Sequence, residues 1–143
     1  MNEEHGLRRG LTNYGDRDFA AYLRRSFAHS MGLSREMLEK PIIGIAMTPS
    51  GFNNCHRMMP DLVVAVSRGV LVAGALPRTF PTTSLGEVFL SPTSMVYRNL
   101  MSMDTEEMVR AQPMDAVVLI GGCDKTVPAQ LMGAASALSL IHI

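Results

Sequence analysis

The sequence predicts an α/β fold with a parallel sheet flanked by helices, and three observations support this prediction. Short segments of strand length occur at residues 42–47, 78–80 and 117–120, and the first and the last of them are apolar runs. Segments with the helical spacing of apolar residues lie between and after them. Each run ends in a loop rich in glycine, proline and polar residues. Strands that alternate with helices in this way usually pair in parallel, because each helix returns the chain to the same end of the sheet.

Composition limits the chain to an ordinary soluble domain. Its 143 residues are 47% hydrophobic and 18% charged, which suits one modest globular unit. Equal numbers of basic and acidic residues, 13 of each, give no net charge that would attract nucleic acid or an anionic membrane. No apolar run approaches the roughly 20 residues of a membrane span, and the amino terminus lacks the apolar core of a signal peptide. We therefore expect a cytoplasmic protein with a small-molecule partner and reduced cysteines.

The first part of the chain predicts an arm and a helix. Residues 1–15 are polar and contain three glycines, which favours an irregular arm that contacts a partner. Asp16 or Asp18 is placed to cap a helix that ends near Gly32, and Ser34 is placed to start a further turn. The helix is expected to turn one apolar side inward, formed by Phe19, Tyr22, Leu23 and Phe27.

The first apolar run leads to a cysteine. The strand at 42–47 is expected to end in a loop that carries Cys55, followed by a helix over residues 57–73 with Pro60 in its first turn. The dipole of a helix that begins just beyond Cys55 would lower the pKa of its thiol, whereas a buried and inert thiol is the alternative. The inward stripe of this helix is expected to be Leu62, Val66 and Val70.

The strand candidate at residues 78–80 leads to a carboxylate. The loop at residues 81–87 ends in Glu87. Ser91 and Pro92 then predict the cap and first turn of a helix, and Asp104 with Glu107 predicts the capping box of a second one. The first of these helices is expected to bury Val96, Leu100 and Met103, and Pro113 to stop the second.

The last apolar run leads to three reactive side chains in succession. Residues 117–120 suggest a strand covered on both faces, and the glycines after it precede Cys123, Asp124 and Lys125. Thr126 is placed to cap a helix over residues 128–137. The alternative is an ordinary strand-end turn with a buried cysteine and two solvated charges.

These loops all follow strands, so their side chains should meet at one edge of the sheet. Cys55 and Cys123 would then lie together although they are far apart in sequence, and two thiolates suit a soft metal or an iron-sulfur cluster. Glu87 and Asp124 instead suit a hard cation such as Mg²⁺. Neither a CxxC motif nor a zinc pattern of Cys and His is present, so spacing alone is a weak indication.

Five separated blocks carry a more specific resemblance. They are Lys40–Ala46, Asn53–His56, Pro81–Glu87, Tyr97–Leu100 and Gly121–Thr126. In this order they resemble the amino-terminal part of the dihydroxy-acid dehydratase and phosphogluconate dehydratase family, over roughly residues 7–137. Enzymes of this family remove water from hydroxylated carboxylic acids with an iron-sulfur cluster and Mg²⁺.

The resemblance assigns roles to individual residues. Cys55 and Cys123 match two of three cysteines that hold the cluster, of either the [2Fe-2S] or the [4Fe-4S] type. Glu87, Asp124 and Lys125 match Mg²⁺ ligands, and Lys125 matches a catalytic lysine that is carbamylated in some members. The third cysteine and the serine that removes the proton match parts of the family enzymes beyond this chain.

The resemblance also implies a domain plan. Residues 1–15 would be the arm, and residues 16–137 a partial amino-terminal domain of a larger two-domain enzyme. Residues 138–143 are expected to be a non-native tail, because they read as the translated end of a sequencing adapter. The intact enzyme would be a homo-oligomeric hydro-lyase, and this chain alone would be inactive.

The run Ser84–Glu87 resembles the sugar-acid branch of the family, whose members convert aldonates to 2-keto acids. A 2,3-dihydroxy-acid dehydratase of branched-chain amino-acid biosynthesis is the alternative within the family. A non-catalytic metal- or ligand-binding domain, or a small metal carrier, is the alternative of another class.

Overall fold

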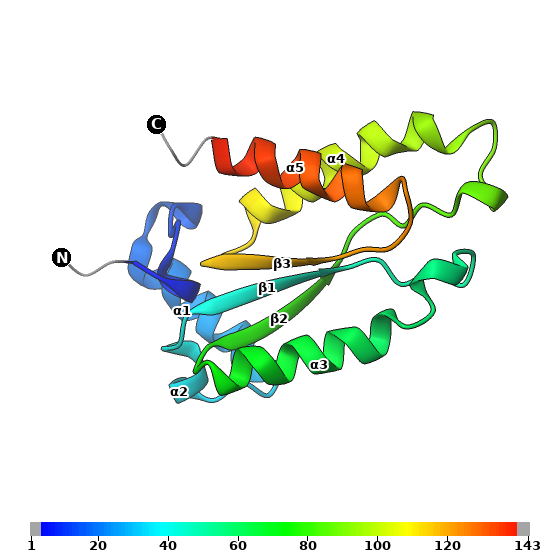
Figure 1. The fold of residues 1–143 in the computed structure, drawn as a ribbon. Helices are drawn as coiled ribbons and strands as arrows, with labels where there is room; N and C mark the ends of the chain where they lie inside the picture. The colour runs from blue at the N-terminus through cyan, green and yellow to red at the C-terminus, as the bar shows by residue number, and fades with distance from the viewer. Residues whose placement is uncertain (1–3, 140–143) are drawn as a thin grey trace.

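A three-stranded parallel sheet forms the centre of the molecule, as the sequence predicts (Figure 1). The computed structural model describes residues 4–139. Strand β1 (Ile42–Met47) lies between β2 (Leu76–Pro81) and β3 (Ala116–Ile120) and pairs with both in parallel. The helices are α1 (Arg17–Ser30), α2 (Arg35–Leu38), α3 (Met59–Val72), α4 (Ser94–Ala111) and α5 (Thr126–Ser139). The described residues include no helix that is long and apolar enough to cross a membrane.

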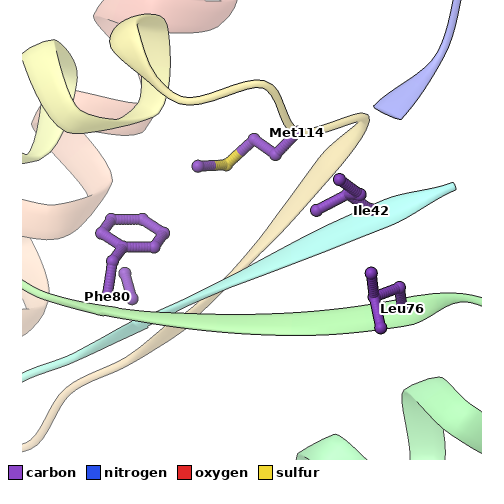
Figure 2. Close-up of a cluster of buried hydrophobic side chains, with 5 residues drawn as sticks. Ile42, Leu76, Phe80 and Met114 are labelled. Carbon is purple, nitrogen blue, oxygen red and sulfur yellow. The ribbon is translucent and has the colours of Figure 1, made fainter. Parts of the chain in front are cut away.

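Each face of the sheet has its own apolar cluster. On one face, α3 packs Met59 against Ile45 and Ile120. On the other face, Ile42, Leu76, Phe80 and Met114 lie together (Figure 2). Gly44 of β1 lies under this second cluster, where an added Cβ would come within 2.5 Å of the Met114 sulfur. A side chain at this position would require the end of the Met114 side chain to move.

The predicted helix α1 is present, but its predicted apolar side is wrong. Asp16 caps the helix by accepting hydrogen bonds from the backbone N–H groups of Asp18 and Phe19. The buried residues are the small Ala20 and Ala28, whereas the aromatic residues predicted to face inward are exposed: Phe19, Tyr22 and Phe27. Small residues on the inner side let the helix backbone approach the rest of the domain closely.

The described part of the predicted arm is docked on the domain. The Gly6 N–H donates to both carboxylate oxygens of Asp115, at 2.8 and 3.1 Å, and the Ile42 N–H donates to the same carboxylate at 2.8 Å. The Arg24 guanidinium donates to the carbonyls of Leu7 and Arg9. One acidic side chain thus joins the amino-terminal segment to the beginnings of β1 and β3.

One continuous helix, α4, replaces the two helices that the sequence suggests between β2 and β3. Thr93, rather than Ser91, caps it, and the predicted second start at Asp104 lies inside it. The predicted stripe of Val96, Leu100 and Met103 is exposed. The buried side consists of Ser94, Met101, Ser102 and Thr105. Small and hydroxyl-bearing residues again form the close contact, here with α5.

Helix α3 starts two residues later than predicted, and Pro60 lies in its first turn as expected. Leu62, predicted to be buried, is 47% exposed, because the inward stripe is Met59, Val63 and Val66.

Two further predictions about the last strand and helix are corrected. Strand β3 is only partly covered, with Ala116 exposed, because it lies at the edge of the sheet.

Helix α5 begins at Thr126 itself, so this residue does not act as a cap in front of Pro128. Its hydroxyl instead lies 3.4 Å from the Leu85 carbonyl, to which it donates. Ala129 of α5 packs against Met101 and Leu85. Of the predicted tail at 138–143, residues 140–143 lie outside the described part of the chain, and the tail stays a prediction.

Candidate functional site

The loops that follow the three strands meet at one edge of the sheet, as predicted. Cys55 lies in a 3-10 turn, Asn54–His56, between β1 and α3. Glu87 begins another turn, Glu87–Phe89, beyond β2. Cys123, Asp124 and Lys125 lie between β3 and α5. All five residues that the sequence singles out are therefore in the loops at the carboxyl ends of parallel strands, where open α/β sheets bind ligands.

Asn53 connects all three loops through one buried amide, and its side chain is 3% exposed. Its Oδ1 accepts hydrogen bonds from the Cys55 N–H at 3.0 Å and from the Cys123 thiol at 3.3 Å. Its Nδ2 donates to the Leu85 carbonyl at 2.7 Å. Both cysteines are thus tied to one fixed point.

His56 makes a second connection among the same loops. The side chain is 1% exposed. Nδ1 lies 2.8 Å from the Ser84 hydroxyl, and Nε2 lies 2.9 Å from the Gly122 carbonyl and 3.1 Å from the Gly122 nitrogen. In the sequence, Asn53 and His56 belong to the same block as Cys55, which predicts no separate role for either of them. Their only signal was a place beside Cys55 in a loop that follows a strand.

Two glycines allow the loops to touch backbone to backbone. A Cβ added at Gly122 would lie 3.1 Å from the Cys55 carbonyl oxygen and 3.4 Å from the Cys55 Cβ. A Cβ at Gly86 would lie 2.5 Å from the Phe52 carbonyl oxygen. A side chain at Gly86 would overlap the Phe52 backbone, and one at Gly122 would press on Cys55, so the site is closely packed below its exposed groups.

The two cysteines are neighbours at this edge. Cys55 is exposed and Cys123 is half-buried. Burial raises the pKa of the Cys123 thiol, the nearby Cys55 thiol raises it further, and the hydrogen bond to Asn53 opposes both effects. Cys123 also has a φ of 70°, in the left-handed region that residues other than glycine seldom adopt. Backbone strain of this kind is concentrated at functional sites.

Lys125 lies between two carboxylates. Its Nζ is 2.7 Å from Asp124 Oδ2 and 3.4 Å from Glu87 Oε1. The lysine side chain is 14% exposed, while the carboxylates are 62% and 56% exposed. The hydrogen bond to Lys125 lowers the pKa of Asp124, and the same contact raises the pKa of Lys125, with Glu87 adding to the effect. The arrangement favours the ammonium form of the lysine.

The donor atoms form two separate partial ligand sets. Within residues 4–139, no three side chains of His, Cys, Asp and Glu gather closely enough to hold a metal ion. The paired thiols have the chemistry of cluster ligands, and the paired carboxylates have that of Mg²⁺ ligands. The Lys125 ammonium now lies where the second set would hold its cation. Mg²⁺ fits there only if that charge moves away or is removed.

Comparison with known proteins identifies the family. The family described as dihydroxy-acid/6-phosphogluconate dehydratase N-terminal matches residues 40–143. A 6-deoxy-6-sulfo-D-gluconate dehydratase of Pseudomonas putida is 44% identical over 142 residues, which cover 95% of this chain and 24% of the relative. An L-arabonate dehydratase of Azospirillum brasilense is 46% identical over 86% of this chain and 21% of the relative.

A dihydroxy-acid dehydratase of Lachnoclostridium phytofermentans is 37% identical over 78% of this chain and 21% of the relative. The chain thus spans between a fifth and a quarter of the length of these curated relatives. The resemblance of the five sequence blocks is confirmed over most of the chain. The chain belongs to the dihydroxy-acid/6-phosphogluconate dehydratase family, whose amino-terminal part it matches.

Proposed function

We propose that this chain is the amino-terminal part of a hydro-lyase that converts a sugar acid, an aldonate, to a 2-keto acid. In this reaction a proton leaves the carbon next to the carboxylate, and a hydroxyl leaves the following carbon as water. The resulting enol becomes the 2-keto acid without any net oxidation. The observation that carries the proposal is the meeting of two thiols with two carboxylates and a lysine at one sheet edge.

Cys55 and Cys123 would hold an iron-sulfur cluster, together with ligands from outside this chain. When bound, the cluster supplies a Lewis acid for the departing hydroxyl, and Mg²⁺ stabilises negative charge on the substrate's carboxylate side. The chain's contribution is to fix the donors in place. Asn53 does so through its hydrogen bonds to the Cys55 N–H and the Cys123 thiol.

Glu87, Asp124 and a carbamylated Lys125 would hold Mg²⁺. An ammonium group repels a divalent cation, so the lysine in its present state opposes metal binding. Addition of CO₂ to the neutral amine, with loss of a proton, forms a carbamate whose oxygens suit Mg²⁺. The two carboxylates keep Lys125 protonated. A cation bound to them would weaken this effect and favour the neutral amine, and the carbamate formed from that amine would in turn bind the cation. We therefore expect carbamylation and metal binding to assist one another.

We further propose that the substrate is a pentonate or hexonate rather than 2,3-dihydroxyisovalerate. The run Ser84–Glu87 supports this choice, as do the names of the two sugar-acid relatives, which are 44% and 46% identical to this chain. The same proposal includes that the intact enzyme is cytoplasmic, forms a homo-oligomer and acts on small hydroxy acids.

The test is a competition assay on the full-length protein, reconstituted anaerobically with iron and sulfide. A panel of aldonates should be dehydrated in preference to 2,3-dihydroxyisovalerate. Preference for the dihydroxy acid would overturn the substrate assignment. If neither the aldonates nor the dihydroxy acid were dehydrated, the proposed hydro-lyase activity would be overturned.

Glu87→Gln should abolish turnover and leave the visible absorption of the cluster in place, because it removes one Mg²⁺ ligand charge at nearly constant size. Glu107→Gln, on the exposed side of α4, is the matched control and should keep normal turnover. Normal activity of Glu87→Gln would refute the proposed Mg²⁺ role.

A further inference from the structure

A buried histidine with no assigned role joins the three loops of the candidate site. We propose that His56 is a positioning residue: its imidazole holds the backbone at Gly122, and thereby Cys123, against Cys55. The inference rests on the proposed function only in one respect, that the two thiols hold an iron-sulfur cluster. The geometry itself comes from the contacts of His56 with Ser84 and Gly122.

The imidazole can satisfy both contacts with its proton on either nitrogen. With the proton on Nδ1, the ring donates to the Ser84 hydroxyl, and Nε2 accepts from the Gly122 N–H. With the proton on Nε2, the ring donates to the Gly122 carbonyl, and the Ser84 hydroxyl donates to Nδ1. A serine hydroxyl can donate or accept, so the ring keeps both partners in either form.

The contact at Gly122 matters because Cys123, the next residue, has a backbone conformation that it does not favour. Its φ of 70° is held only if surrounding contacts exceed the cost of the left-handed conformation. Gly122 supplies such contacts, since its backbone is hydrogen-bonded to the His56 ring and lies close to Cys55. A loop released at Gly122 would relax at Cys123 and move its thiol away from Cys55.

His56 and Asn53 restrain different parts of the same loop. Asn53 contacts this loop at the Cys123 thiol, whose Sγ lies 3.3 Å from the Asn53 Oδ1. His56 contacts the loop one residue earlier, at the Gly122 backbone. The contact that restrains the backbone next to Cys123 therefore belongs to His56.

The test measures how readily the two thiols are joined in the chain free of any cluster. The sequence has two cysteines, so a short bis-maleimide can make only one cross-link within a chain, between Cys55 and Cys123. Its rate is measured at low protein concentration, and mass spectrometry excludes products that join two chains. The same rate in concentrated urea gives the value for unrestrained loops, and far-ultraviolet circular dichroism checks that each variant is folded.

Two substitutions separate the two ring contacts. Gln places an amide near the position of Nε2 and can keep the contact with Gly122, whereas Asn places it near Nδ1 and can keep only the contact with Ser84. We expect His56→Gln to cross-link within about twofold of the unchanged chain, and His56→Asn to be slower by about fivefold or more. Arg57→Gln is the matched control at the exposed neighbouring residue and should have no effect.

A folded His56→Asn that cross-links at the unchanged rate would overturn the inference. The inference would also be overturned if a folded His56→Gln cross-linked as slowly as His56→Asn, since this would show that the Gly122 contact does not control the cross-linking rate. If His56→Asn fails to fold, His56→Gln and Ser84→Ala decide: both keep the Gly122 contact and should cross-link within about twofold of the unchanged chain, so strong slowing in either folded variant would overturn the inference. Failure of the full-length protein to dehydrate any acid would reject the proposed function and leave the cross-linking result unaffected.

Discussion

Lys125 shows how neighbours decide the state of one side chain. Asp124 and Glu87 hold it as an ammonium, and the raised pKa of Lys125 means that this contribution to folding is lost only as the pH rises through that pKa. The lowered pKa of Asp124 acts on the other side, so its contribution is lost as the pH falls through that lowered pKa. The pair therefore stabilises the loop across the neutral range.

Asp124→Asn should lower the pKa of Lys125, because it removes the main hydrogen-bond partner of the ammonium. The neutral amine that reacts with acetic anhydride then becomes more abundant. Acetylation of Lys125, measured by mass spectrometry relative to Lys40, the other lysine of the sequence, should increase. Asp61→Asn, at an exposed position of α3, serves as control. An unchanged ratio in Asp124→Asn would show that the carboxylate does not control the amine.

Cys123 shows the cost of placing a thiol in a left-handed turn. Cys123→Gly and Cys123→Ala both remove the thiol, but only glycine adopts a φ of 70° without penalty. We expect Cys123→Gly to be the more stable by about 1 kcal/mol in denaturant unfolding. Equal stability of the two variants would mean that the turn relaxes when the sulfur is absent.

At the level of elements, α4 holds the loop that presents Glu87. Asp104 lies inside this helix, and its Oδ2 accepts from the Thr83 N–H at 2.7 Å and from the Thr83 hydroxyl at 2.8 Å. The aspartate predicted to start a helix therefore anchors the loop after β2. Its sequence pattern fitted a capping box because short acidic patterns also occur on helix surfaces.

Asp104→Ala should free the loop at residues 82–87, because it removes two hydrogen bonds to a charged acceptor, each worth about 1.5–3 kcal/mol. Hydrogen exchange of this segment, followed by mass spectrometry, should become at least about tenfold faster. Glu107→Ala, on the exposed side of the same helix, should leave the exchange unchanged. Equal exchange in both variants would contradict the anchoring role of Asp104.

The errors at this scale have one physical cause. Periodicity predicted large apolar residues inward in α1 and α4, whereas the buried residues are Ala20 and Ala28 in α1 and, in α4, Met101 with small hydroxyl-bearing residues. Where small residues form most of a helix contact, most of the large side chains of that helix stay exposed. Periodicity shows that a helix exists, but the residue size at each contact decides which face is inward.

For the whole molecule, the parallel sheet and the meeting of the loops could be predicted, because alternating strands and helices allow few arrangements. The cysteine and carboxylate positions followed from the same rule. The contacts made by Asn53 and His56 could not be predicted, since they depend on distances between loops that are remote in sequence. The contact between Lys125 and Glu87 could not be predicted for the same reason.

The isolated chain should not dehydrate any acid of the panel after reconstitution with iron, sulfide and Mg²⁺. The structure supplies two thiols and two carboxylates, and the proposed reaction also requires a third cluster ligand and a base. Product formation can be followed by detection of 2-keto acids, with the full-length protein as positive control. Clear turnover by this chain alone would show that its own residues suffice.

The position of β1 in the sheet affects how the protein is made. The register pairs Ile42 with Leu76 and Ile43 with Ala116, so the central strand is synthesised first and its second partner much later. At about 5–20 residues per second, β1 would wait roughly 4–15 seconds on the ribosome before β3 emerges. Asp115 appears at the same late moment and secures Gly6, 109 residues away. The contact of Gly6 with Asp115 can therefore form only after β3 has been synthesised, although Gly6 itself precedes β1 in the sequence.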